Sequence, residues 1–199
     1  AETLYSLKDY AVSISAYQKV IQLDANYPSV DFAYYSLACA LFELGKYNDA
    51  LSQLERLLKD YPNTVLIGYA HIKESAAYSQ LGKYQEAKKH FELASTLSTD
   101  NAVMADARYG IGESLYHLEQ FPQAVEALST FIQTYPKSRH IPQAYDQLAF
   151  CYLKVKNYSA AKAAYAKAVE TPPSDTTQAG RASGDTFYYT LAQALENDG

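Results

Sequence analysis

The chain has 199 residues, of which 48% are hydrophobic and 20% are charged, a composition typical of a folded protein rather than a disordered one. Its net charge is −5, which argues against the concentrated basic surface that nucleic-acid binding requires. No apolar run approaches the ~18 residues of a membrane-spanning helix, so we expect no direct insertion into a membrane.

A short phrase recurs along the whole chain: an aromatic residue followed, three positions later, by Ala or Ser. It starts at Tyr10, Tyr47, Tyr84, Phe121 and Tyr158, and each step is 37 residues. A fixed period of this length is typical of proteins built from stacked structural repeats.

The first complete unit predicts two helices. Segment 34–44 places apolar residues at the i, i+3, i+4, i+7 spacing of one helix face, at Tyr34, Leu37, Ala38 and Leu41. Segment 47–62 does the same with Ala50, Leu54, Leu57 and Leu58, and Pro62 ends it. Neither helix can bury its apolar face alone, so the sequence predicts an all-α solenoid of stacked helical hairpins.

Later units keep this order of residues, with substitutions. The second unit has His71 at the first large position and Glu74 where Leu is usual, and the third has Gly112 at the small position. The fourth carries Tyr145, Leu148, Ala149, Tyr152, Tyr158, Ala161, Tyr165 and Ala168. The pattern, with Gly45 at the turn and Pro62 at the end, resembles the tetratricopeptide repeat over essentially the whole chain. The resemblance implies a right-handed superhelix of hairpins that binds proteins or peptides in a concave groove.

Two details narrow the resemblance. The period is 37 rather than the usual 34 residues, and two predicted helices end in Tyr-Pro, at 61–62 and 135–136. Both features are similar to the bacterial subgroup found in the periplasmic partner of the Tol–Pal system and in a lipoprotein of the outer-membrane β-barrel assembly machine. This likeness favours the periplasm or cell envelope over the cytoplasm.

We expect a single solenoid segment over residues 1–199. It divides into a partial repeat 1–27, complete repeats 31–64, 68–101, 105–138 and 142–173, a linker 174–184, and the first helix of a further repeat, 185–199. The last helix presents Tyr188, Leu191 and Leu195 at core spacing with no partner to follow. We therefore expect the chain either to belong to a longer array or to have lost disordered flanks, and the open helix offers a surface for self-association.

A second stripe on the first helix of each unit lies roughly 120° from the core stripe. In the family that this chain resembles, this stripe looks into the groove. We expect partner binding at Phe32, Tyr35, Phe42, Tyr69, Ile72, Asp106, Tyr109, Glu113, Tyr116, Asp146, Phe150 and Tyr189. Aromatic anchors and acidic groups favour a neutral to basic protein or peptide. The alternative is that these rings pack between adjacent first helices.

No constellation in the sequence indicates catalysis. His71, His90, His117 and His140 do not have the spacing of a metal-binding motif, so we expect neither a metal site nor a cofactor. Cys39 and Cys151 are expected to be buried as small apolar residues. Gly110 and Gly112 lack the third glycine and the lysine of nucleotide-binding loops, and Gly112 is expected at a close approach of two helices.

The predicted function is a non-catalytic interaction scaffold, in a bacterial envelope or a multi-protein assembly. Two alternatives stay open at this point. One is a structural spacer or self-association module, and the other is a regulatory arm of a larger protein whose catalytic domain lies outside this segment.

Overall fold

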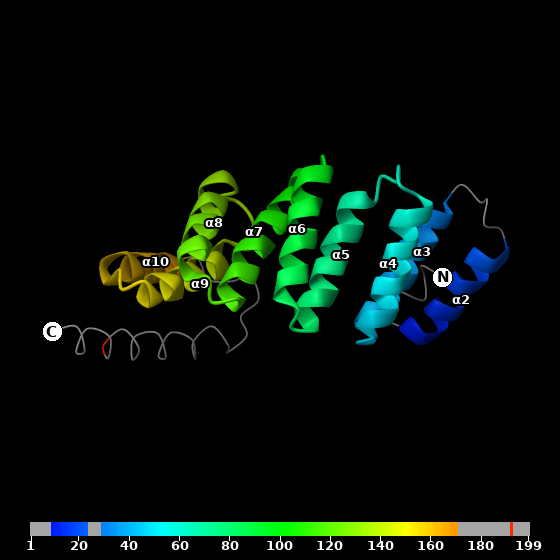
Figure 1. Cartoon of the computed structure of the whole chain (residues 1–199), viewed down its shortest axis with the longest axis horizontal. Helices are drawn as coiled ribbons and strands as arrows, with labels where there is room; N and C mark the ends of the chain where they lie inside the picture. The colour runs from blue at the N-terminus through cyan, green and yellow to red at the C-terminus, as the bar shows by residue number, and fades with distance from the viewer. Residues whose placement is uncertain (1–8, 24–28, 171–191, 193–199) are drawn as a thin grey trace. The chain divides into compact units, whose positions relative to one another are not determined.

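The computed structural model describes residues 9–23, 29–170 and 192, and helices account for the regular secondary structure of these residues (Figure 1). They are α2 (Tyr10–Leu23), α3 (Val30–Glu43), α4 (Tyr47–Asp60), α5 (Ile67–Gln80), α6 (Tyr84–Leu97), α7 (Asn101–His117), α8 (Phe121–Thr134), α9 (Ile141–Lys154) and α10 (Tyr158–Glu170). No strand occurs in the residues described. The predicted all-α class is confirmed.

The helix boundaries follow the 37-residue period. The aromatic residues that define the period are the first residues of α2, α4, α6, α8 and α10. Helices α4 and α8 end directly before the two Tyr-Pro pairs, because proline removes a backbone donor and clashes with the preceding turn. Helix α7 has 17 residues rather than 14, and the Asp100 carboxylate accepts the Ala102 N–H at 2.7 Å at its start.

Each hairpin turns through a residue in the left-handed region. The first two turns use Gly45 (φ 72°) and Gly82 (φ 70°), whereas the next two use Glu119 (φ 58°) and Lys156 (φ 61°) at the equivalent positions. Glycine adopts this conformation without the steric penalty that a Cβ atom brings. The turn geometry is therefore the same in all four hairpins, while the residue suited to it is present in only two.

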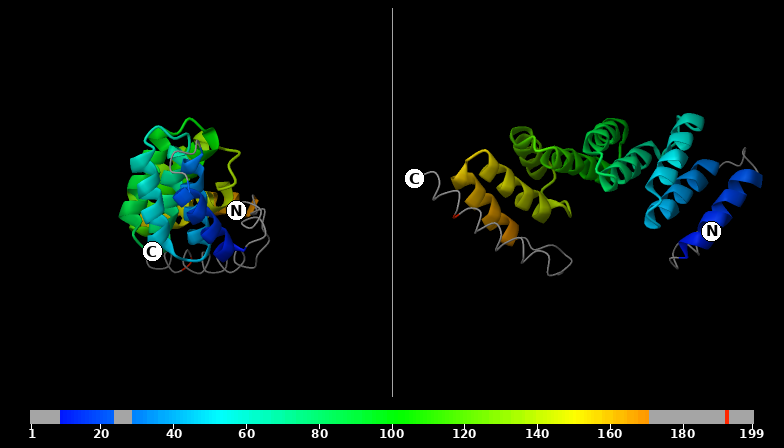
Figure 2. Two further views of the ribbon diagram at one scale, coloured as in Figure 1. Left: turned by 90° about the vertical axis from the view of Figure 1, so that its right-hand side faces the viewer. Right: turned by 60° about the horizontal axis from the view of Figure 1, so that its bottom comes forward.

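The chain divides into two compact units, residues 1–107 and 108–199, and the boundary falls within α7. In the first unit α2 packs on α3, α3 on α4, α4 on α5 and α5 on α6, and α3 also contacts α5. In the second unit α8 packs on α9, and α9 on α10. The views in Figures 1 and 2 agree that successive helices of each pair lie side by side. This is the stacking of hairpins expected for a solenoid.

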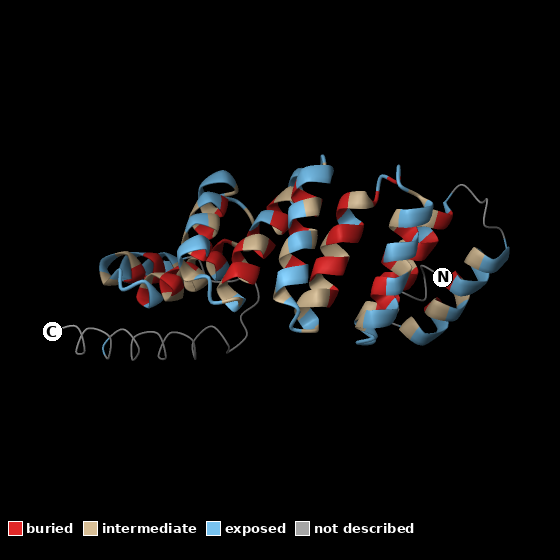
Figure 3. Cartoon of the chain, viewed as in Figure 1, coloured by how far each residue is buried: buried red, intermediate tan, exposed pale blue. Residues whose placement is uncertain are grey.

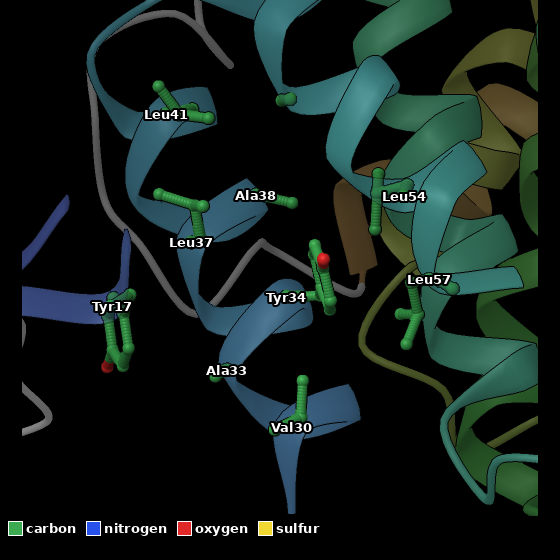
Figure 4. Close-up of a cluster of buried hydrophobic side chains, with 11 residues drawn as sticks. Tyr17, Val30, Ala33, Tyr34, Leu37, Ala38, Leu41, Leu54 and Leu57 are labelled. Carbon is green, nitrogen blue, oxygen red and sulfur yellow. The ribbon is translucent and has the colours of Figure 1, made fainter. Parts of the chain in front are cut away.

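The predicted core stripe of the first hairpin is buried as expected. Tyr34, Leu37, Ala38, Leu41, Ala50, Leu54 and Leu57 belong to one buried cluster, and Leu58 packs against it half-buried. Tyr34 points from α3 toward Leu54 and Leu57 of α4 (Figure 4). Figure 3 shows the same arrangement along the chain, with buried residues on the helix faces that meet neighbours and exposed residues on the other faces. The apolar periodicity thus identified the core correctly.

A close helix approach lies at Gly112, as predicted. A Cβ atom added there would come within 2.6 Å of Leu128 Cδ2 of α8, so only glycine fits without a shift of the neighbour.

Among the described residues, no helix has the length and apolar character needed to cross a membrane. The linker 174–184 and the side chains of Tyr188, Tyr189, Leu191 and Leu195 lie outside the described residues.

Candidate functional site

The stripe predicted for partner binding runs over α3 and α5 in the first unit. Two of its rings are markedly exposed, with 47% of Phe32 and 39% of Tyr69 accessible to solvent. Tyr35, Phe42 and Ile72 are half-buried. This surface, Phe32, Tyr35, Phe42, Tyr69 and Ile72, is called the first-unit stripe below. It offers two open aromatic rings beside three partly covered apolar side chains.

Phe42 also takes part in packing between repeats. Its ring makes an edge contact with Tyr47, with centroids 5.2 Å apart. The Lys73 ammonium lies 4.6 Å from the ring centroid, a cation–π geometry that connects α3 to α5. One predicted binding residue therefore stabilises the surface that it helps to form.

Tyr69 has a second contact through its hydroxyl. The phenol donates a short hydrogen bond to the carboxylate of Asp100, the residue that caps α7. Hydrogen bonds from Tyr69 and from the Ala102 backbone stabilise the ionised carboxylate and lower the pKa of Asp100. The ring of Tyr69 is exposed while its polar end is fixed.

Tyr109 of the second unit differs from the other stripe tyrosines, because it is buried. Its ring stacks on His140 with centroids 4.4 Å apart and an interplanar angle of 3°, and it contacts Phe131 of α8. Its hydroxyl donates to Glu113 at 3.0 Å. Burial, and then the charge of Glu113, raise the pKa of Tyr109. The ring packs against its neighbours, as the packing alternative describes, and a role of Tyr109 in partner binding stays a prediction.

A second aromatic surface joins α7 to α9. The Tyr116 ring lies 5.4 Å from the Phe150 ring in edge contact, and Phe121 of α8 also contacts Phe150. The Lys154 ammonium is 5.1 Å from the Phe150 centroid. Tyr116 and Phe150 are both half-buried. The structure thus brings these two predicted residues together.

Two acidic residues accompany this aromatic pair. Glu113 accepts hydrogen bonds from Tyr109 and, at 3.3 Å, from Gln147 Nε2. Burial raises the pKa of Asp146, since desolvation disfavours its charged form. We call Glu113, Tyr116, Asp146 and Phe150 the second-unit stripe. Asp106, the third predicted acid, is half-buried on the part of α7 that belongs to the first unit.

The sequence analysis missed a cluster inside the second hairpin. His71 is buried, and between α5 and α6 it meets Glu74 and His90. The signal was present in the sequence, because Glu74 occupies a position where this repeat normally has leucine. His117 ends α7, and His140 precedes α9. Cys39 and Cys151 are buried as predicted, and burial raises the pKa of both thiols.

Comparison with known sequences identifies the repeat. Sequence profiles of the tetratricopeptide repeat match residues 1–27, 32–64, 67–101, 106–138 and 142–175. They are profiles of a helical repeat and indicate no enzyme family. No curated protein matches the sequence.

Solved structures share the fold at low sequence identity. A crystal structure of MamA is 23% identical with a TM-score of 0.72, and the match covers 84% of this chain and 91% of that one. MamA residues 41 to the end from Desulfovibrio magneticus RS-1 are 18% identical with a TM-score of 0.71, over 85% and 89% of the two chains. A tetratricopeptide repeat protein from Parabacteroides merdae is 14% identical with a TM-score of 0.77, over 98% and 73%.

These structural matches bear on the fold alone, because all three identities are low. The narrower likeness to the Tol–Pal-associated and β-barrel assembly proteins stays a prediction. The repeat pattern, the helical hairpins and the profile matches along the chain agree with one another. The chain belongs to the tetratricopeptide repeat family.

Proposed function

We propose that this chain is a non-catalytic protein-interaction module that binds a peptide segment of a partner protein along its first helices. The observation that carries the proposal is the exposure of Phe32 and Tyr69 on the first-unit stripe. These residues occupy equivalent positions in successive repeats, 37 residues apart. Exposed rings on a preorganised helical surface are typical of binding hot spots.

The second-unit stripe supports a neutral to basic ligand. Asp146 is partly desolvated, and the raised pKa of its carboxyl shows that its charge is poorly stabilised in the free protein. A cationic side chain beside it would restore that stabilisation. Tyr116 and Phe150 provide apolar surface next to the acid. We therefore propose a peptide that carries apolar residues together with Lys or Arg.

A panel of short random peptides, screened against the purified chain, tests the proposal. The double variant Phe32→Ser/Tyr69→Ser should bind selected peptides at least ~10-fold more weakly, since hot-spot side chains typically contribute more than ~1–2 kcal/mol each. The matched control is Val65→Ser/Leu97→Ser, which removes two exposed apolar residues of the same unit outside the stripe. It should retain the wild-type affinity. Equal losses in both variants, with the helical circular dichroism unchanged, would contradict the proposal.

A charge test is separate. Asp146→Asn should reduce affinity for basic peptides on the order of tenfold and leave neutral peptides unaffected. An unchanged ratio of basic to neutral affinities would refute the charge preference and leave the aromatic part of the proposal standing.

The alternatives predict different solution behaviour. A spacer or self-association module would bind none of the peptides, and it would sediment as a concentration-dependent oligomer. A regulatory arm would bind a domain of its own parent protein. The setting in a bacterial envelope or multi-protein assembly remains a prediction that depends on the 37-residue spacing and the Tyr-Pro helix ends.

A further inference from the structure

Three polar side chains converge inside the second hairpin, away from both stripes. The Glu74 Oε2 atom lies 2.8 Å from His71 Nδ1 and 2.7 Å from His90 Nδ1, and the two nitrogens are 3.3 Å apart. His71 and Glu74 come from α5 and His90 from α6, all within the first unit. Glu74 is only 1% exposed, whereas the His90 side chain is 18% exposed. The cluster is buried at one end and reaches solvent at the other.

The repeat itself does not require these residues. At the three equivalent positions the other complete repeats carry Tyr34, Leu37 and Gln53, then Arg108, Ile111 and Ala127, and then Tyr145, Leu148 and Ala164. An apolar residue occupies the Glu74 position in each of them. Burial of a carboxylate is costly unless it is strongly partnered, so Glu74 requires the two histidines beside it, whereas the neighbouring repeats place an apolar residue at its position and need no such partners. A ligand that needs these groups would account for a buried carboxylate at a position where the repeat is otherwise apolar.

The three atoms also have the dimensions of a metal site. A tetrahedral ion with bonds of about 2.0–2.1 Å separates its ligand atoms by ~3.3 Å. The two nitrogens are already at that separation, and the carboxylate oxygen is about half an ångström closer to each. All three ligand atoms lie within 4.8 Å of one another. Small side-chain rotations would therefore open the triangle to accept an ion.

We propose that His71 Nδ1, His90 Nδ1 and Glu74 Oε2 form a binding site for a divalent transition-metal ion of the zinc class. Two imidazoles and one carboxylate are a ligand set that such ions accept, with solvent as the fourth ligand on the exposed side of His90. Binding requires each imidazole to hold its proton on Nε2 instead of Nδ1, and both rings stay neutral. The buried carboxylate then supplies a charge that the ion compensates.

Electrostatics of the free cluster agree with this reading. Burial acts to raise the pKa of Glu74, but hydrogen bonds from His71 and His90 outweigh it, and the pKa lies below its usual value. The Tyr78 ring packs 5.2 Å from the His90 ring and restricts its movement. The proposal does not depend on the function of either stripe.

The test uses the full chain without a histidine tag, stripped of metal by a chelator and titrated with Zn²⁺ by calorimetry and with Co²⁺ by absorption spectroscopy. We expect one ion per chain, and intense visible bands for Co²⁺ in a tetrahedral site. At free metal ~100 times above Kd, the ratio of folded to unfolded protein should rise ~100-fold, seen as a higher Tm.

Two variants distinguish loss of metal binding from loss of folding. The triple variant His71→Tyr/Glu74→Leu/His90→Gln installs the residues of the preceding repeat, so it should fold and lose at least ~100-fold in metal affinity. The control His117→Gln/His140→Phe removes the other two histidines of the chain and keeps an aromatic ring against Tyr109. It should bind like the wild type.

A wild-type chain that binds no Zn²⁺, or binds it as tightly as the triple variant does, would overturn the proposal. In that case the cluster is a buried hydrogen-bond network only. Loss of binding in the control, with the triple variant unaffected, would place the metal on the other histidines and equally refute it.

Discussion

Gly112→Ala should destabilise the second unit through one steric contact. The added Cβ atom would lie 2.6 Å from Leu128 Cδ2 and 2.8 Å from its Cγ, whereas carbon atoms prefer ~3.5–4.0 Å. Leu128 is fully buried on α8, so its side chain cannot move into solvent. Because both contacts are well below the normal separation and Leu128 is fully buried, we expect a cost in the upper half of the ~1–3 kcal/mol typical of overpacking, about 2–3 kcal/mol, and alanine's better helix propensity returns ~1 kcal/mol. We expect a net loss of about 1–2 kcal/mol in the free energy of unfolding, measured by urea denaturation.

A double-mutant cycle separates the clash from other effects. Leu128→Ala alone removes a buried side chain and should cost ~2–5 kcal/mol. In the double variant the new methyl group partly fills the space left by Leu128, so the combined loss should fall short of the sum by ~1 kcal/mol or more. Additive losses, or a single Gly112→Ala variant as stable as the wild type, would refute the steric reasoning.

Three further predictions concern turns, core and charge. Gly45→Ala should lower the free energy of unfolding by ~1 kcal/mol, because it places a side chain in a left-handed turn. Lys156→Gly should raise it by about 0.5–1 kcal/mol, because it removes a side chain from the equivalent turn. If thermal denaturation showed that both variants change stability in the same direction, the prediction would be contradicted. Leu54→Ala should cost ~2–5 kcal/mol, and Leu58→Ala, at a half-buried site, less than half of that in the same assay. Asp146 has a raised pKa when folded, so its contribution to stability is present below the unfolded value of ~3.9 and is lost as pH rises through the folded pKa. Asp146→Asn removes this loss of stability at higher pH, so the Tm of the variant minus that of the wild type should increase from pH 4 to 7. A Tm difference that does not change with pH would contradict the assignment of this effect to Asp146.

The fold could be predicted from the sequence because repetition reinforces weak signals. Tyr34, Leu37 and Leu41 alone would suit a buried helix in many folds, but the aromatic residue that starts each second helix recurs every 37 residues and so fixes hairpin boundaries and stacking together. The earlier start of α7 was not visible in this way. It depends on Asp100 as a cap, a local hydrogen bond that the period does not encode.

The candidate site was less predictable. Helical periodicity indicates the direction in which a side chain points, but not which other segments of the chain cover that side chain. Phe32 and Tyr109 share one stripe by register, yet Phe32 is exposed while His140, from the segment before α9, covers Tyr109. The buried cluster required a relation across 19 residues between His71 and His90 on different helices. Metal-binding motifs defined by short sequence spacing do not describe such a pair. The one indication in the sequence was Glu74, at a position where this repeat normally has leucine.

Tyr69 connects an exposed surface of the molecule to the start of helix α7. Its ring is open to solvent on the first-unit stripe, and its hydroxyl holds the carboxylate that starts α7. A ligand that tilts the ring would therefore loosen or tighten the first turn of α7, the helix that contains the boundary between residues 107 and 108. Tyr69→Phe keeps the ring and removes the hydroxyl, so amide hydrogen exchange at Ala102 and Val103 would report the state of the cap separately from contact with a ligand. Amide exchange at the start of α7 would thus report whether a ligand is bound at the Tyr69 ring.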